Sequence, residues 1–220
     1  MNTTETAARD EIVRTARSLF SRGLTHGSTG NISVRTGDDR MIVTPTGSSL
    51  GTVEPEDLSV TDLRGRHLDG GRPSKEAFLH AAVLRARPAS HAVVHTHSTH
   101  AAAVSCLPAL DSESALPPLT AYFAMRIGRL PLLPYHAPGD PALEPLAERA
   151  AATRVALLLA NHGPIVAGRS LSAAADAIEE LEETAKLYLL LGERVTSPLT
   201  EPEAHRLWSA HGHLPDATAA

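Results

Sequence analysis

Two histidines, His95 and His97, follow the strand-forming run Ala92-Val93-Val94 and are separated by a single residue. Successive side chains of a strand point to opposite faces, so residues i and i+2 share a face, about 6.5–7 Å apart along the backbone. Two imidazoles on one face can chelate a divalent metal ion, and imidazole suits zinc and related transition metals. The spacing therefore predicts part of a metal site on a buried strand.

A third histidine, His162, follows the apolar run 155–160 in the turn Asn161-His162-Gly163-Pro164. Three neutral imidazoles at one sheet edge leave an open coordination position, which a catalytic metal requires. The alternative is that all three are ordinary core, surface or turn histidines. His211-Gly212-His213 has the same spacing near the C-terminus, so the spacing alone is weak evidence. Competing candidate ligands are His80, His91, His100 and Cys106.

Glu76 is the carboxylate closest before the histidine strand that also opens a helix. With Ser74 as the N-cap, Glu76 is expected in the first helical turn. Its functional interpretation is a general acid and base beside a metal-bound substrate. The alternative is a glutamate that only stabilises the helix dipole.

Three loops rich in small and hydroxyl residues precede the histidine strand, at Ser28–Asn31, Thr46–Ser49 and Ser74–Lys75. Their open backbone N–H groups suit a bound phosphate. Each loop taken alone could be only a turn.

The 220 residues carry a net charge of −5, and the Lys and Arg residues are scattered. A chain with this charge has no basic surface that would attract nucleic acid or an anionic membrane, so neither is expected as a partner. No apolar run reaches the roughly 18 residues of a membrane span. The single cysteine excludes an internal disulfide and the N-terminus is polar, so we expect a cytoplasmic protein. We expect one domain over residues 1–210 and a disordered tail over 211–220.

Apolar periodicity and turn residues predict an α/β protein: a single domain with a central mixed or antiparallel sheet flanked by helices. The acidic cluster at residues 179–183 is predicted to be a solvated helix face. The expected helices are 4–22, 75–84, 99–107, 121–127, 141–151, 172–192 and 201–208. The expected strands are 32–35, 41–44, 59–63, 67–68, 91–97, 130–134, 155–160 and 165–167.

Five segments, taken together and in this order, resemble the class II aldolase/adducin family, which includes L-fuculose-phosphate aldolase and L-ribulose-phosphate 4-epimerase. They run across about the first three-quarters of the chain, and the ordered combination is specific although each part is not. The segments are Thr29–Arg35, Thr44–Gly47, Pro73–Glu76, His95–His97 and Asn161–Gly163.

The resemblance implies a role for each of these positions. His95, His97 and His162 become ligands of a divalent metal ion, zinc first, with manganese or cobalt as alternatives. Glu76 becomes the catalytic glutamate, which favours bond cleavage because the family's epimerases carry aspartate there. Tyr122 resembles a tyrosine that reaches into a neighbouring subunit's site, which implies a homotetramer with active sites at subunit interfaces. The residues expected to bind the phosphorylated sugar or sugar-acid substrate are Ser28, Gly30, Asn31, Thr46, Gly47, Ser74 and Lys75.

One branch of the family, the 3-oxo-tetronate 4-phosphate decarboxylases, is most similar to this sequence. Lys75 replaces a second serine of the aldolases, and its cation is expected to face a substrate carboxylate, a phosphate or solvent. The other segments that fit this branch are 24–31, 116–120, 138–141 and 180–188.

The branch implies a definite reaction. A 3-oxo acid loses carbon dioxide when a Lewis acid polarises its ketone, because the electrons form a metal-stabilised enediolate. Protonation by Glu76 would then release dihydroxyacetone phosphate. The alternatives are a sugar-phosphate aldolase, an epimerase, or a non-catalytic adducin-like scaffold, which would be expected to lack the histidines or the glutamate.

Overall fold

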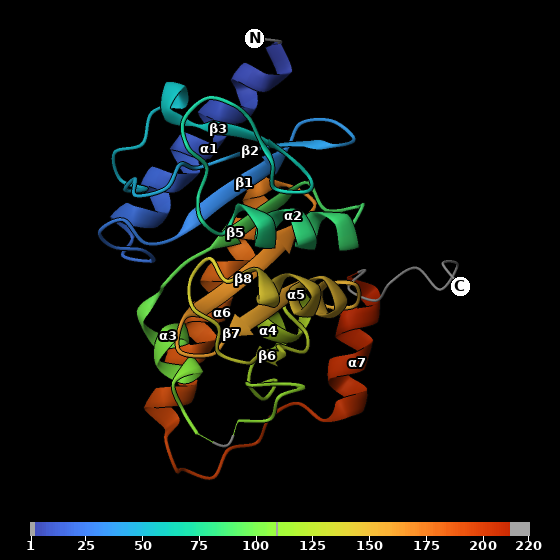
Figure 1. Cartoon of the computed structure of the whole chain (residues 1–220). Coiled ribbons are helices and arrows are strands. Elements are labelled where there is room, and N and C mark those ends of the chain that lie inside the picture. Colours follow the sequence, from blue (N-terminus) through green and yellow to red (C-terminus); the bar gives the residue numbers. More distant parts are fainter. Residues whose placement is uncertain (1–2, 109, 212–220) are drawn as a thin grey trace.

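The computed structural model describes residues 3–108 and 110–211. They form one eight-stranded sheet with the strand order β4-β3-β2-β1-β5-β8-β7-β6 (Figure 1). Every neighbouring pair is antiparallel except β6 and β7, which run parallel. The predicted fold class, α/β with a mixed and largely antiparallel sheet, is therefore confirmed.

The elements follow one another along the chain as the apolar periodicity predicts. The strands are β1 (Asn31–Arg35), β2 (Arg40–Val43), β3 (Ser59–Asp62), β4 (His67–Asp69), β5 (Ala92–His95), β6 (Leu132–Leu133), β7 (Ala156–Leu159) and β8 (Gly163–Gly168). The α-helices are α1 (Thr3–Ser21), α2 (Ala77–Ala86), α3 (Thr99–Ser105), α4 (Ala121–Arg126), α5 (Glu144–Ala151), α6 (Leu171–Leu191) and α7 (Glu201–Ala210). Two short 3-10 helices lie at Pro55–Asp57 and Pro141–Leu143.

Helices cover both faces of the sheet, and strand alternation divides the apolar side chains between them. On β5, Val94 packs into the core under α1, α3 and α6, whereas Val93 packs into the core under α2 and α5. Because both faces are buried, β5 and β7 read as nearly continuous apolar runs. In Figure 1, α2 and α5 lie on the near face and α6 lies behind the sheet.

Three local predictions were wrong. Helix α2 begins at Ala77 with Glu76 as its N-cap residue, so Ser74 is not the N-cap and Glu76 lies before the first turn. Strand β5 ends at His95, because the chain then turns into α3 and places His97 beyond the strand. Strand β6 has only two residues instead of the five expected.

The last helix, α7, packs against α4 through a small cluster that contains Ala124, Ala204 and Trp208. It begins with the predicted capping box, in which Thr200 and Glu203 satisfy each other's backbone N–H groups. His211 follows α7, and its Nδ1 is hydrogen-bonded to Leu207 O. The expected tail beyond it, with Gly212 and His213, lies outside the described residues.

One edge of the sheet collects the ends of the central strands. The register pairs His95 with both Asn31 on β1 and Ile165 on β8, while Leu159 at the end of β7 pairs with Gly163. The turn that carries His162 therefore lies beside the end of β5. Strand pairing alone brings residues that are distant in the sequence to one place.

Candidate metal centre

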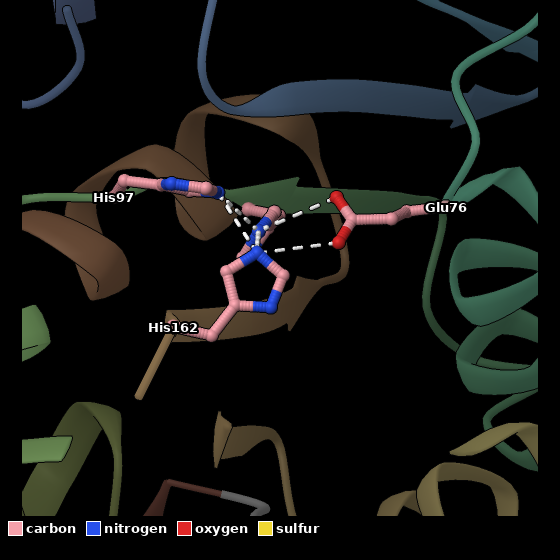
Figure 2. Close-up of side chains that lie close together, drawn as sticks. Glu76, His97 and His162 are labelled. Atoms are coloured by element: carbon pink, nitrogen blue, oxygen red, sulfur yellow. Dashed lines mark hydrogen bonds and ion pairs between the residues drawn. The ribbon is translucent and has the colours of Figure 1, made fainter. Parts of the chain in front are cut away.

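The three imidazoles His95, His97 and His162 converge at this edge, and Figure 2 shows the rings of His97 and His162 directed towards each other. Their Nε2 atoms form a triangle with sides of 3.1 Å between His97 and His95, 3.3 Å between His95 and His162, and 3.0 Å between His162 and His97. Nitrogens about 2.0–2.1 Å from one tetrahedral zinc ion lie about 3.3 Å from one another. The spacing of the three nitrogens therefore fits a single divalent cation.

The tautomer of His95 also fits a metal site. Its ring is 1% exposed, and its Nδ1 lies 2.8 Å from Pro164 O. A carbonyl can only accept, so Nδ1 carries a proton and Nε2 is the ring nitrogen that faces the other two imidazoles. A backbone carbonyl that orients an imidazole in this way is a common feature of metal-bound histidines.

The pKa values of the other two imidazoles keep them neutral. Burial and the neighbouring imidazoles His95 and His162 lower the pKa of His97 to about 3. Burial and His95 lower the pKa of His162 to about 4, against an opposing effect of Glu76. At pH 7 both rings therefore have lone pairs available for a cation, with no proton to displace.

Glu76 approaches the imidazoles from the start of α2, on the side opposite His97 (Figure 2). Its Oε2 lies 3.5 Å from His95 Nε2 and its Oε1 lies 3.3 Å from His162 Nε2. Asn31 Nδ2 donates a 2.8 Å hydrogen bond to Oε2, and Oε1 is buried without a hydrogen-bond partner. Glu76 and the three histidines form a group whose ligand atoms lie within 4.8 Å of one another.

The charge state of Glu76 results from opposing effects. Burial raises the pKa of this carboxyl, but the neighbouring imidazoles of His95 and His162 and the hydrogen bond from Asn31 have the larger combined effect and lower it to about 2. The carboxylate is therefore ionised at neutral pH. An ionised carboxylate beside three imidazoles can ligate a cation or take up a proton from a reacting group.

The glycine-containing loops reach the same edge. A Cβ on Gly30 would lie 2.9 Å from His95 O, so the loop before Asn31 runs directly along the end of β5. Thr46 N donates to Arg72 O and Ser74 N donates to Thr44 O, which joins the second loop to the third. The side chains of Thr46 and Ser74 are partly exposed, as phosphate-binding groups must be.

The other expected substrate-binding residues lie on exposed backbone. Gly47 has a φ of +74°, with nothing within 4 Å of the space that a Cβ would fill. Ser28 is exposed in the turn before β1, and Lys75 is exposed between Ser74 and Glu76. Tyr122 is 60% exposed on α4, and its ring packs 5.7 Å from the Arg126 guanidinium.

The competing histidines have other partners. His80 is fully buried, with Nδ1 2.8 Å from Ser33 Oγ. His91 is exposed at the start of β5, and its backbone N–H donates to Gly168 O. Cys106 is an exposed free cysteine.

His100 pairs with Glu182, whose Oε1 lies 2.7 Å from His100 Nδ1 and also accepts from His100 N. Its Oε2 accepts from Ala101 N. Glu182 is 6% exposed, so the prediction of a solvated acidic face is wrong at this residue. It lies on the buried side of α6, where it satisfies the first N–H groups of α3.

The sequence interpretation missed the pairing of Ser33 with His80. Asn31 and Ser33 are two residues apart on β1 and therefore share one face of the strand. Glu76 and His80 are four residues apart at the start of α2 and therefore share one face of the helix. Two hydrogen bonds, Asn31 to Glu76 and Ser33 to His80, therefore join the strand to the helix. The combination of i, i+2 polar residues on a strand with i, i+4 polar residues on a helix was the available signal.

The family model of the class II aldolase and adducin N-terminal domain matches residues 10–189. The chain belongs to this family. A 3-oxo-tetronate 4-phosphate decarboxylase from Escherichia coli (strain K12) is 47% identical over 205 residues, which cover 93% of this chain and 97% of that protein. The relatives found are decarboxylases and aldolases by name, which are lyases, and the resemblance inferred from the five sequence segments is confirmed.

Solved structures agree with this assignment. The crystal structure of YgbL from Escherichia coli has a TM-score of 0.89 and 46% identity, and the match covers 92% of this chain and 98% of that one. An L-fuculose 1-phosphate aldolase has a TM-score of 0.83 and 29% identity, with coverage of 94% and 96%. Among the described residues, no helix has the length and apolar character that crossing a membrane requires.

Proposed function

We propose that this protein is a metal-dependent carbon–carbon lyase that converts a 3-oxo-tetronate 4-phosphate into dihydroxyacetone phosphate and carbon dioxide. The observation that carries the proposal is the near full-length identity of 47% to a decarboxylase of that name, in a chain whose four polar site residues converge. The aldolase relatives are less similar, with 33% identity for an L-fuculose phosphate aldolase from Haemophilus influenzae.

His95, His97 and His162 would hold the divalent cation, which we propose to be zinc because three imidazoles with an open position suit it. Bound there, the cation would supply a Lewis acid that polarises the substrate ketone. Gly30, Asn31, Thr46, Gly47 and Ser74 would bind the phosphate, with Ser28 and Lys75 completing the substrate contacts. The proximity of Gly30 and Asn31 to His95 supports one continuous site.

Glu76 would move the proton. In the reaction the bond between the carboxylate carbon and C2 breaks, carbon dioxide leaves, and the electron pair shifts towards the ketone oxygen. A proton taken from solvent and held on a Glu76 oxygen is then delivered to C2. The negative charge of the departing carboxylate moves to the ketone oxygen, and protonation of C2 restores the ketone. Asn31 keeps the carboxylate aimed at the site through its 2.8 Å hydrogen bond.

The expected assembly and location are part of the same proposal. We propose a homotetramer in which Tyr122 completes a neighbouring subunit's site, since its ring is 60% exposed in the single chain. A cytoplasmic location suits the free thiol of Cys106. Light scattering of the purified protein tests the tetramer, and a monomer with full activity would contradict it.

The reaction is tested by offering the purified protein two substrates separately, 3-oxo-erythronate 4-phosphate and L-fuculose 1-phosphate. We expect carbon dioxide and dihydroxyacetone phosphate from the first and no aldehyde from the second. Aldehyde release from the second substrate without carbon dioxide from the first would assign the protein to the aldolases.

Two variants test the roles of the residues. Glu76→Gln should bind metal but lose turnover by a factor of about 10²–10⁴, the usual contribution of a positioned acid and base. His97→Ala should lose the metal itself, while His67→Ala, an exposed histidine on β4, should keep it. Equal metal content in the two histidine variants would contradict the ligand assignment.

A further inference from the structure

The third imidazole comes from a different segment than the other two. His162 lies 65 residues beyond His97, in the turn between β7 and β8. Asn161 in this turn has a φ of +55°, in the left-handed region that asparagine adopts more readily than most other residues with a side chain. The contacts to residues 161–163 decide where the His162 ring lies.

Ser105, the last residue of α3, makes two of these contacts. Asn161 N donates to Ser105 O at 3.0 Å, and His162 N donates at 3.2 Å both to Ser105 Oγ and to Leu159 O within the turn. The hydroxyl donates its one hydrogen to Ala102 O at 2.7 Å, which leaves a lone pair for the His162 N–H. Ser105 is 3% exposed, so water has little access to replace the hydroxyl.

The turn is held from its other side by the end of the histidine strand. A Cβ on Gly163 would lie 2.4 Å from Thr96 O, so only glycine allows this close approach. Helix α3 is in turn fixed at its first residues by the Glu182 carboxylate on α6. Because α3 starts two residues after His97 and ends at Ser105, it links the His97 segment directly to the His162 turn.

We infer that Ser105 is a positioning residue for His162: its hydroxyl and carbonyl fix the Asn161–His162 backbone so that the third imidazole meets His95 and His97. This inference rests on the proposed metal site. Ser105 does not touch the cation; it acts through the backbone of His162. Outer contacts of this kind typically contribute 10–100-fold to metal affinity.

The test measures the Zn²⁺ affinity of purified variants by competition with a chelating dye, and the visible spectrum of the Co²⁺-loaded proteins. Ser105→Ala should weaken Zn²⁺ binding by about tenfold or more and alter the Co²⁺ spectrum. Ser105→Thr, which keeps the hydroxyl, should stay close to the wild type. The matched control is Thr61→Val, since the Thr61 hydroxyl is also buried but has no hydrogen-bond partner.

Urea unfolding of the chelator-treated variants separates positioning from general destabilisation. Ser105→Ala and Thr61→Val should both remain folded, and only Ser105→Ala should lose Zn²⁺ affinity. Wild-type affinity in Ser105→Ala, or an equal loss in Thr61→Val, would overturn the inference. A wild-type protein that binds no Zn²⁺ or Co²⁺ would instead overturn the metal site, and the inference with it.

Discussion

The buried imidazole of His80 should make the stability of the metal-free protein depend on pH. Burial lowers the pKa of His80 to about 3, with the neighbouring His95 acting in the same direction and Glu76 opposing it. An unfolded histidine has a pKa near 6.5. Between these two values the unfolded chain binds the proton and the native protein does not, so stability falls as the pH falls.

The size of the effect follows from the two pKa values. Between pH 7.5 and pH 5.0 the unfolded state gains about 2 kcal/mol from protonation of His80, while the native state gains almost nothing. His80→Asn removes the titrating group and places an amide near Ser33 Oγ. The stability advantage of the wild type over His80→Asn should therefore shrink by about 2 kcal/mol over this range.

The assay is urea unfolding at pH 7.5 and pH 5.0, with chelator present so that the other site histidines contribute equally to both proteins. His67→Asn, which replaces an exposed histidine, is the control and should keep the wild-type dependence on pH. If the difference between the wild type and His80→Asn does not change with pH, His80 is not held neutral in the native protein and the reasoning is refuted.

Three further predictions concern the surroundings of the site. Gly163→Ala places a Cβ 2.4 Å from Thr96 O. It should therefore lower the free energy of unfolding in urea by about 1–3 kcal/mol and weaken Zn²⁺ binding. Wild-type values for both would contradict the close approach. Glu182→Ala removes the acceptor of His100 and should cost about 2–3 kcal/mol; a change within about 0.5 kcal/mol, usual for a surface substitution, would show that the carboxylate does not hold α3. Free Zn²⁺ at 100 times its Kd should raise the free energy of unfolding by about 2.7 kcal/mol. This stabilisation should be absent in His97→Ala. If it persists in that variant, the ion binds at another site.

Periodicity predicted most of the fold because both faces of the sheet are buried. The apolar runs before His95 and His162 could be identified as central strands, and the capping box at Thr200 marked the start of α7. Strand β6 was overestimated because only two of the residues 130–134 pair in the sheet, and Pro131 and Pro134 have no N–H group to donate to a neighbouring strand. The start of α2 was misplaced because a serine before a helical pattern is typical of an N-cap. In the structure Ser74 Oγ accepts a hydrogen bond from Glu76 N, but the helix begins only at Ala77.

The candidate site was predicted as a set of residues, but its geometry was not. The two-residue spacing of His95 and His97 suggested one strand face, whereas His97 reaches the cluster from beyond the end of β5. The convergence with His162 depends on the register of β5 and β8. The role of Ser105 was missed and that of Glu182 was predicted wrongly, because both roles arise from tertiary contacts that no local pattern encodes.

The most direct test of the proposed function is to titrate chelator-treated protein with Zn²⁺ and follow carbon dioxide release from 3-oxo-erythronate 4-phosphate. We expect no turnover in the chelated protein, and a linear recovery that ends at one bound ion per chain. Dihydroxyacetone phosphate should form in equal amount to carbon dioxide. Full turnover in the chelated protein, or no carbon dioxide from the metal-loaded protein, would contradict the account.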